Sequence, residues 1–305
     1  MKRPANIALL CGAAAVILSC IIMLNLLKND TTMEILTGTY GGHIYRYSFD
    51  TESLEFTLLE KIEAENASYA IKDAVNIYAV SETGNASGAY SFSIGSPTAM
   101  TADKRQTGAD PCFIMKYDDK ILTADYSGGS ISIFPISGGA LGDCLQSLAF
   151  HGNGPVGGRQ ESSHIHQLKT IPLTDWILAS DLGADKIRVL RFENGTLVHK
   201  SDIGCPAGSG PRHMEFSKDN KTLYCIAELS GNVLVYSINI TDIPQFTLIQ
   251  EIQADEVNAG GSADIHLHPS GQYIYTSHRL DNDGISIFKR QRNSLFSGRI
   301  NRIIR

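Results

Sequence analysis

The 305-residue sequence is 43% hydrophobic and carries a formal net charge of -6 at pH 7. A chain of this length and apolar content can bury a large core, so its composition argues against intrinsic disorder. Nucleic-acid binding depends on clustered Lys and Arg that neutralise phosphates, so the acidic balance argues against a nucleic-acid partner. No CxxC pair occurs among the six cysteines, which excludes a zinc ribbon and a thioredoxin-type redox motif.

Residues 1–30 differ from the rest of the chain. Lys2 and Arg3 precede a long apolar run. This run is closer in length to the roughly 20 residues that span a bilayer than to the apolar centre of a cleaved signal peptide, and the positive-inside rule keeps the two basic residues in the cytoplasm. We therefore expect an export signal or membrane anchor that places the chain in the periplasm or on the outer surface. If Met33 is the true start, the protein is instead cytoplasmic.

From residue 31 onward the chain repeats one hairpin pattern six times, at intervals of about 42 to 55 residues. Each copy has an apolar strand, a short polar turn with Gly, Asn or Asp, and a second strand in which apolar and polar residues alternate. The copies begin "EILTGTYGG", "NIYAVSETG", "KILTADYSGG", "WILASDLGAD", "TLYCIAELSGN" and "YIYTSHRLDNDG". Such a repeat, with room for four strands, is typical of the blades of a β-propeller. We therefore predict an all-β propeller over residues 31–288, with about six blades.

Polar residues recur at two positions of this repeat. The innermost strand of every blade begins near one mouth of the central channel, so side chains at that level converge. The starts of these strands carry His164, His166, Arg212, His213, Asp264 and His266, and the turns after the second strands carry Asp125, Asp181, Glu228 and Arg279. We expect these residues to form one polar site in the channel mouth.

Five motifs in order make the sequence similar to the lactonase family of seven-bladed β-propellers, which includes 6-phosphogluconolactonase and carboxy-cis,cis-muconate cyclase. The motifs are "ESSHIHQ", "SDLGADKI", "GSGPRHMEFS", "AELSGNVLVY" and "ADIHLHPSGQYIYTSHR". The resemblance covers about residues 33 to 288. It implies a metal-free site without a cofactor, a small lactone as substrate, and catalytic roles, by motif position, for four residues: His166, Glu228, Arg212 and Arg279.

Hydrolysis of a lactone needs a base that deprotonates water and donors that stabilise the oxyanion. His166 and Glu228 suit the proton transfer, and we expect them to lie within about one water-bridged contact of each other. The forked guanidinium groups of Arg212 and Arg279 suit an acidic substrate and the developing charge. Four further residues are assigned to substrate binding: His164, His213, Asp181 and His266. The serine of "GSGPRH" stands in a turn before a strand, which is the wrong context for a nucleophile elbow.

Alternatives to this assignment follow from the same residues. His266 and His268 form a second HxH pair, and two such strands could in principle bind zinc, as in a metal-dependent gluconolactonase-like enzyme. Asp125 and Asp181 stand in turn positions where aspartate commonly has a structural role. "GNGPVGG", at residues 152–158, lacks the lysine and the helix of a phosphate loop and is typical of a mobile loop at the channel mouth. A third possibility is an inactive propeller that only binds a ligand or a protein.

The C-terminal residues depart from the family pattern. After "DGISIFKRQRN" the family would supply another blade, whereas residues 289–305 form a basic and irregular tail. We expect this tail to be poorly ordered from residue 291 and to take the place of the last blade. The ring would then be incomplete, with unpaired strand edges that lower solubility.

Overall fold

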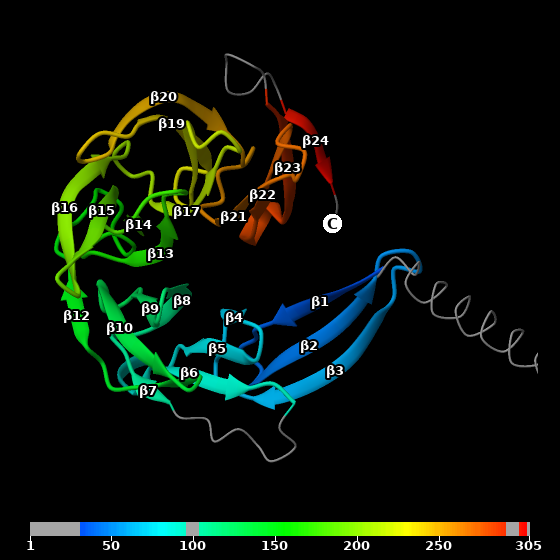
Figure 1. The fold of residues 1–305 in the computed structure, drawn as a ribbon. Helices are drawn as coiled ribbons and strands as arrows, with labels where there is room; N and C mark the ends of the chain where they lie inside the picture. The colour runs from blue at the N-terminus through cyan, green and yellow to red at the C-terminus, as the bar shows by residue number, and fades with distance from the viewer. Residues whose placement is uncertain (1–30, 96–103, 291–298, 304–305) are drawn as a thin grey trace, which may run out of the picture. The chain divides into compact units, whose positions relative to one another are not determined.

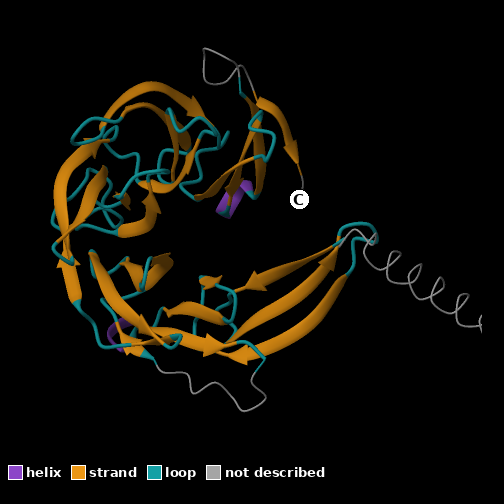
Figure 2. Ribbon diagram, viewed as in Figure 1, coloured by secondary structure: helices purple, strands orange, loops and turns teal. Residues whose placement is uncertain are grey.

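The computed structural model describes residues 31–95, 104–290 and 299–303, which consist almost wholly of β-strands and their connections (Figures 1 and 2). Two short 3-10 helices, Gly84–Ala86 and Leu280–Asn282, are the helical elements of this part of the chain. Among the described residues, no helix has the length and apolar character needed to cross a bilayer. The export signal or membrane anchor predicted at residues 1–30 lies outside the described residues.

The described strands form six antiparallel sheets that succeed one another along the chain. A three-stranded sheet contains β1 (Thr32–Thr37), β2 (His43–Asp50) and β3 (Phe56–Glu63). The other five sheets contain β4 (Ala70–Lys72), β5 (Asn76–Ser81), β6 (Gly88–Ser93) and β7 (Arg105–Gln106); β8 (Pro111–Tyr117), β9 (Lys120–Asp125), β10 (Ser130–Ser137), β11 (Ala140–Leu141) and β12 (Gln146–Ala149); β13 (Ile165–Thr170), β14 (Trp176–Asp181), β15 (Lys186–Glu193) and β16 (Thr196–Gly204); β17 (Pro211–Phe216), β18 (Thr222–Ala227), β19 (Asn232–Asn239) and β20 (Gln245–Gln253); and β21 (Ser262–Leu267), β22 (Tyr273–His278), β23 (Gly284–Lys289) and β24 (Arg299–Ile303). Each hairpin repeat of the sequence corresponds to one sheet, so the predicted fold class is confirmed.

The chain divides into two compact units. The smaller unit contains described residues 31–37 and 45–62, which supply most of the three-stranded sheet. The larger unit contains residues 38–44 and the described residues from 63 onward, with the other five sheets. In this larger unit the sheets follow one another around a common centre, where the first strands β8, β13, β17 and β21 are neighbours (Figure 1).

Apolar side chains fill the space between adjacent sheets of the larger unit. Four clusters join its five sheets in succession, and the one between the β13–β16 and β17–β20 sheets contains Trp176, Leu178, Met214 and Phe216. The middle strands β14 and β18 are buried along their whole length. Burial on both faces explains why "WILA" and "LYCIA" are continuous apolar runs and do not alternate with polar residues.

The C-terminal tail differs from its expected irregular form. Residues 299–303 form β24, which pairs antiparallel with β23 and becomes the fourth strand of its sheet. Strand pairing is made by backbone N–H and C=O groups, which every residue except proline provides in full. A basic segment can therefore add to an edge even where its composition shows no strand pattern.

Gly183 lies in the turn between β14 and β15, close to the segment that precedes β13. A Cβ atom at this position would lie 1.8 Å from Ser162 O and 2.8 Å from His164 Cδ2. Because a backbone carbonyl cannot swing aside as a side chain can, we expect Gly183→Ala to lower the free energy of unfolding by about 2–3 kcal/mol. Urea denaturation measures this change. Gly204→Ala is the matched control in the same sheet, because its Cβ would meet no heavy atom within 4 Å. Equal unfolding midpoints for the two variants would contradict the prediction.

Candidate active site

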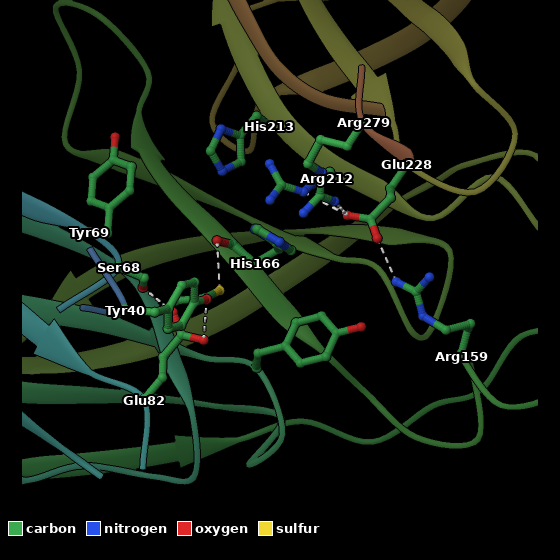
Figure 3. A pocket seen from close by; sticks show the side chains of 12 residues that line it. Tyr40, Ser68, Tyr69, Glu82, Arg159, His166, Arg212, His213, Glu228 and Arg279 are labelled. Atoms are coloured by element: carbon green, nitrogen blue, oxygen red, sulfur yellow. Dashed lines mark hydrogen bonds and ion pairs between the residues drawn. The ribbon is translucent and has the colours of Figure 1, made fainter. Parts of the chain in front are cut away.

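A cavity of about 440 Å³ lies where the first strands of the larger unit begin, and its volume is in the range of small-molecule sites (Figure 3). All five sheets of this unit contribute to its wall. The lining residues are Tyr40, Ser68, Tyr69, Glu82, Cys112, Tyr126, Arg159, His166, Arg212, His213, Glu228 and Arg279. The predicted convergence of polar residues at this level is therefore present for His166, Arg212, His213, Glu228 and Arg279.

Three lining residues occupy β-bulges at the starts of first strands. The strand register shifts between Pro111 and Phe113 in β8, between Ile165 and Gln167 in β13, and between Pro211 and His213 in β17. The residues inserted at these points are Cys112, His166 and Arg212. A bulged residue is unpaired, and the local bend turns its side chain away from the regular alternation of the strand. The bulges thus direct His166 and Arg212 into the cavity while their neighbours remain in the ladder.

The residue that directly follows the second strand forms another level of the wall. Glu82, Tyr126, Glu228 and Arg279 follow β5, β9, β18 and β22 and all line the cavity. Asp125 and Asp181, which the turn pattern places in the same ring, are instead the last residues of β9 and β14. Because side chains alternate along a strand, this difference of one residue turns them to the opposite side. Both carboxylates are fully buried and neither lines the cavity.

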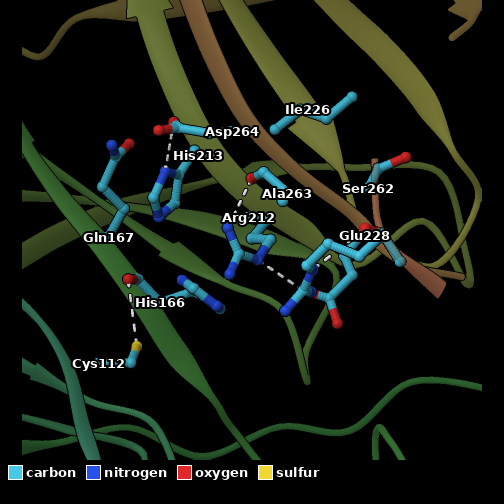
Figure 4. A network of polar contacts seen from close by, with 12 residues as sticks. Cys112, His166, Gln167, Arg212, His213, Ile226, Glu228, Ser262, Ala263 and Asp264 are labelled. Carbon is cyan, nitrogen blue, oxygen red and sulfur yellow. Dashed lines mark hydrogen bonds and ion pairs between the residues drawn. The ribbon is translucent and has the colours of Figure 1, made fainter. Parts of the chain in front are cut away.

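Glu228 is the centre of a network of charged hydrogen bonds (Figures 3 and 4). Arg212 Nε donates to Glu228 Oε2 at 2.6 Å, and Arg279 Nη2 donates to the same oxygen at 3.1 Å. Arg159 Nη2 donates to Glu228 Oε1 at 2.5 Å. The guanidinium of Arg212 is fixed further because its Nη1 donates to Ala263 O at 2.6 Å. Three guanidinium groups around one carboxylate carry an excess of positive charge, which suits an anionic ligand.

His166 and His213 stand beside this network and are only 6% and 5% exposed. Their rings meet edge to face, with centres 5.2 Å apart. Burial lowers the pKa of both imidazoles. For His166 the positive charge of Arg212 adds to the effect, so that its pKa lies well below the ordinary value. For His213 the hydrogen bond to Asp264 opposes the effect without cancelling it. Both side chains are therefore neutral at pH 7, and a neutral imidazole can accept a proton.

The water-bridged contact that we predicted between His166 and Glu228 stays a prediction. Both side chains line the same cavity. The Glu228 carboxylate, however, accepts hydrogen bonds from three arginines. Oε2 accepts two of these bonds and Oε1 accepts one, so Oε1 keeps an acceptor site for a water bridge to His166.

A second group of polar side chains faces the arginines across the cavity (Figure 3). Tyr40 Oη donates to Glu82 Oε2 at 3.0 Å, and Ser68 Oγ donates to the other carboxylate oxygen. Tyr40 is 67% exposed, but partial desolvation of its hydroxyl, followed by the nearby Glu82 charge, raises its pKa to about 12. Burial also raises the pKa of Glu82, although the hydrogen bonds from Ser68 and Tyr40 oppose this. This wall offers hydroxyl and carboxyl groups that can exchange hydrogen bonds with a hydroxylated ligand.

Cys112 lines the cavity without the properties of a nucleophile. Its Sγ lies 3.4 Å from His166 O and donates to it. Burial raises the pKa of the Cys112 thiol. Since the thiolate is the reactive form of cysteine, Cys112 is suited to packing and hydrogen bonding in the wall.

Three residues expected to bind substrate lie outside the cavity wall: His164, Asp181 and His266. His164 precedes the bulge in β13, and its ring stacks on Tyr126 with centres 4.4 Å apart. The His266 side chain is 70% exposed, and its Nε2 lies 3.0 Å from Asp264 Oδ2. The fourth expected substrate-binding residue, His213, does line the cavity.

The second HxH pair shows no zinc-binding geometry. His268 Nδ1 lies 2.8 Å from Ser270 Oγ, and His266 pairs with Asp264. In the part of the chain that the structure describes, no group of three or more His, Cys, Asp and Glu side chains is placed to hold a metal ion.

Asp181 belongs to the interior of its sheet. Its Oδ2 accepts hydrogen bonds from Arg188 Nη2 at 2.7 Å and from Ser163 Oγ at 2.6 Å. Asp181→Asn weakens these charged hydrogen bonds of buried Arg188, which keeps its pair with Asp202, so we expect the free energy of unfolding to fall by about 2 kcal/mol. Chemical denaturation measures this loss. Asp175→Asn, in an exposed pair with Arg191, is the matched control and should cost less than about 1 kcal/mol. Equal losses in the two variants would argue against a structural role for Asp181.

Sequence reasoning missed several lining residues, of which Arg159, Tyr40 and Glu82 bear most on the chemistry. Glu82 had a usable signal, because it follows its strand at the same place in the repeat as Glu228. Arg159 directly follows the glycine-containing loop at residues 152–158, and Tyr40 lies between β1 and β2. Tyr40 had the same signal, because "EILTGTY" places it seventh in its copy, as "TLYCIAE" places Glu228. The position of Arg159 does not recur in the repeat, so periodicity could not identify it.

The sequence profile described as "Lactonase, 7-bladed beta-propeller" matches residues 34–298. The chain belongs to this lactonase family. Among its relatives, a 6-phosphogluconolactonase of Bacillus subtilis is 30% identical over 269 residues, which cover 83% of this chain and 76% of the relative. A 6-phosphogluconolactonase of Formosa agariphila is 28% identical over 265 residues, covering 81% and 75% of the two chains.

Solved structures of the family have the same fold. The crystal structure of a candidate 6-phosphogluconolactonase from Bacteroides fragilis matches with a TM-score of 0.84 and 34% identity, covering 90% of this chain and 83% of that one. The counterpart from Bacteroides uniformis gives a TM-score of 0.83 at the same identity and coverage. The predictions of the family, of its propeller fold and of a lactone-hydrolysing enzyme are thereby confirmed.

Proposed function

We propose that the protein hydrolyses an acidic sugar lactone of the 6-phosphogluconolactone type, with water activated inside the cavity. The observation that carries this proposal is the arrangement of Arg159, Arg212 and Arg279 around Glu228, in the same cavity as neutral His166. A cationic cluster beside a neutral base supplies both requirements of the reaction, namely an anion site and a proton acceptor. Relatives named 6-phosphogluconolactonase support the substrate class.

The three arginines differ in exposure, which suggests different roles. The Arg159 and Arg279 side chains are 38% and 50% exposed, whereas Arg212 is 14% exposed. The two exposed groups would hold a phosphate or carboxylate at the mouth of the cavity. Arg212, which lies beside His166 in Figure 4, would stabilise the charge that develops on the carbonyl oxygen of the lactone.

The reaction then proceeds through two proton transfers. His166 takes a proton from water as the water oxygen bonds to the lactone carbonyl carbon, and Arg212 stabilises the oxyanion. When the oxyanion collapses, the bond between that carbon and the ring oxygen breaks. Protonated His166 returns its proton to the ring oxygen, so the product is the open-chain hydroxy acid. Glu228 holds the arginines in position, and Tyr40 and Glu82 can bind the hydroxyl groups of the sugar.

Steady-state hydrolysis by the purified full-length chain tests the proposal. We expect turnover of 6-phosphoglucono-δ-lactone with a higher kcat/KM than that of glucono-δ-lactone, unchanged by EDTA. Arg159→Gln should reduce this preference, and Arg191→Gln, an exposed arginine paired with Asp175, serves as its control. Loss of activity with EDTA would indicate the metal-dependent alternative. Binding of lactones without turnover would indicate a binding protein.

We also propose that residues 1–30 direct the chain out of the cytoplasm and anchor it to the membrane. The proposal is supported by Lys2 and Arg3 ahead of a long apolar run. Fused to alkaline phosphatase, which is active only after export, residues 1–30 should give phosphatase activity in intact cells. An inactive fusion would favour a cytoplasmic enzyme.

A further inference from the structure

A row of polar groups leads from the cavity wall to the solvent. His213 lines the cavity, and its Nδ1 lies 2.7 Å from Asp264 Oδ1 (Figure 4). The other oxygen of this carboxylate lies 3.0 Å from Nε2 of His266, whose side chain is 70% exposed. Asp264 therefore joins a buried imidazole of the cavity to an exposed imidazole outside it.

Two buried imidazole nitrogens next to this row have no hydrogen-bond partner in the described residues: His166 Nδ1 and His213 Nε2. Their rings have centres 5.2 Å apart. An N–H···N bond of about 3 Å between two imidazoles places the ring centres about 5 Å apart, because each nitrogen lies about 1 Å from its ring centre. A rotation of the His166 ring would thus pair the two nitrogens and satisfy both of them, while His213 keeps its contact with Asp264. Buried polar atoms rarely remain unpaired, which favours this arrangement.

The proton positions along the row follow from the chemistry of its acceptor. Although burial raises the pKa of Asp264, hydrogen bonds from His213 and His266 outweigh this and hold it below its ordinary value. A carboxylate only accepts hydrogen bonds, so His213 Nδ1 must carry the proton. Neutral His213 then has a bare Nε2, which can accept a proton donated by His166 Nδ1. This leaves His166 with a bare Nε2, the nitrogen that a general base requires.

We infer that His213 and Asp264 are positioning residues that fix the tautomer and orientation of His166 as the general base. The inference rests on the proposed function, because it assigns these residues a role in the same reaction. When His166 takes a proton from water, its Nδ1–H donates to His213, which donates in turn to the Asp264 carboxylate. The negative charge thereby stabilises the imidazolium through an intervening histidine, in a chain one residue longer than a Ser-His-Asp triad.

The tautomer can be measured without any substrate. In the full-length chain labelled with 15N-histidine, we expect His166 and His213 each to carry the proton on Nδ1 at neutral pH. In Asp264→Asn, an amide can donate as well as accept, so His213 should lose its single tautomer and His166 should change with it. His268→Gln, on the adjoining turn and outside the cavity, is the control and should leave both spectra unchanged. A proton on Nε2 of His166 in the wild-type protein would overturn the inference.

Kinetics with 6-phosphoglucono-δ-lactone supply the second readout. We expect Asp264→Asn to lower kcat at least about 100-fold with KM changed less than about 3-fold, because the residue does not touch the substrate. Asp264→Glu, which keeps the carboxylate, should recover part of this loss. A wild-type kcat for Asp264→Asn would overturn the inference. If the wild-type chain hydrolyses no lactone, the proposed function fails, while the tautomer measurement still decides whether His213 and Asp264 position His166.

Discussion

Replacing Arg212 by lysine is expected to lower kcat/KM for the acidic lactone by about 100-fold or more. Arg212 donates at once to Glu228 Oε2 and to Ala263 O, both at 2.6 Å. These two bonds fix the plane of a group that would stabilise the oxyanion. A lysine ammonium has the same charge but no planar fork, so it cannot keep both contacts and face the substrate in the same way. Steady-state kinetics with 6-phosphoglucono-δ-lactone measure the effect.

Arg191→Lys is the control for this substitution. Arg191 is an exposed arginine that pairs with Asp175. Its replacement makes the same chemical change outside the cavity and should alter kcat/KM less than about 2-fold. Equal kinetics for the two lysine variants would remove Arg212 from the active site.

Replacing His166 by asparagine is expected to lower kcat by about 1000-fold, the scale of a lost general base. The pH dependence of the wild-type enzyme should identify the same group. Burial first, and the charge of Arg212 second, lower the pKa of His166 well below 6.5. The neutral, proton-accepting form therefore persists as the pH falls through 6.5. We expect kcat/KM to decline only at a more acidic pH, where His166 becomes protonated.

The measurement is a pH–rate profile of kcat/KM, with protein stability checked at each pH. The check is needed because burying a neutral histidine makes the folded state bind fewer protons than the unfolded state below pH 6.5, so stability also falls as the pH falls. His199→Asn, an exposed histidine paired with Asp202, is the control and should keep the wild-type profile. An acid limb centred at or above 6.5 would contradict the assignment of His166 as base.

The fold could be predicted from the sequence because the strands and turn of each hairpin are formed by residues that are close together in the sequence. An apolar strand, a polar turn and a second strand lie within about 20 residues of one another, and this unit recurs six times. The tail could not be predicted in the same way. β24 is held by backbone pairing with β23, which leaves no periodic signal in the residues that form it.

The structure places predicted site residues in the cavity wall where the position in the repeat decides the direction of the side chain. His166 and Arg212 were placed at strand starts, and the structure directs both into the cavity. Asp181 lies one residue before the position that lines the cavity. Because successive side chains of a strand point to opposite faces, its side chain points away from the cavity. The bulges themselves leave no mark in the sequence. Arg159 reaches the cavity from outside the repeat pattern, so only the folded chain places it beside Glu228.

The bulges also affect how the substrate specificity of such a cavity can be altered by substitution. A bulged residue contributes to its blade mainly through the backbone, while its flanking residues keep their places in the ladder. Cys112, whose thiol donates only weakly to Ile165 O and His166 O, could therefore be exchanged with little effect on the packing between blades. A set of variants substituted only at Cys112, which takes no part in the proposed reaction, would change the shape of the cavity wall and keep the catalytic groups. Substrate range and thermal stability should then vary independently of each other.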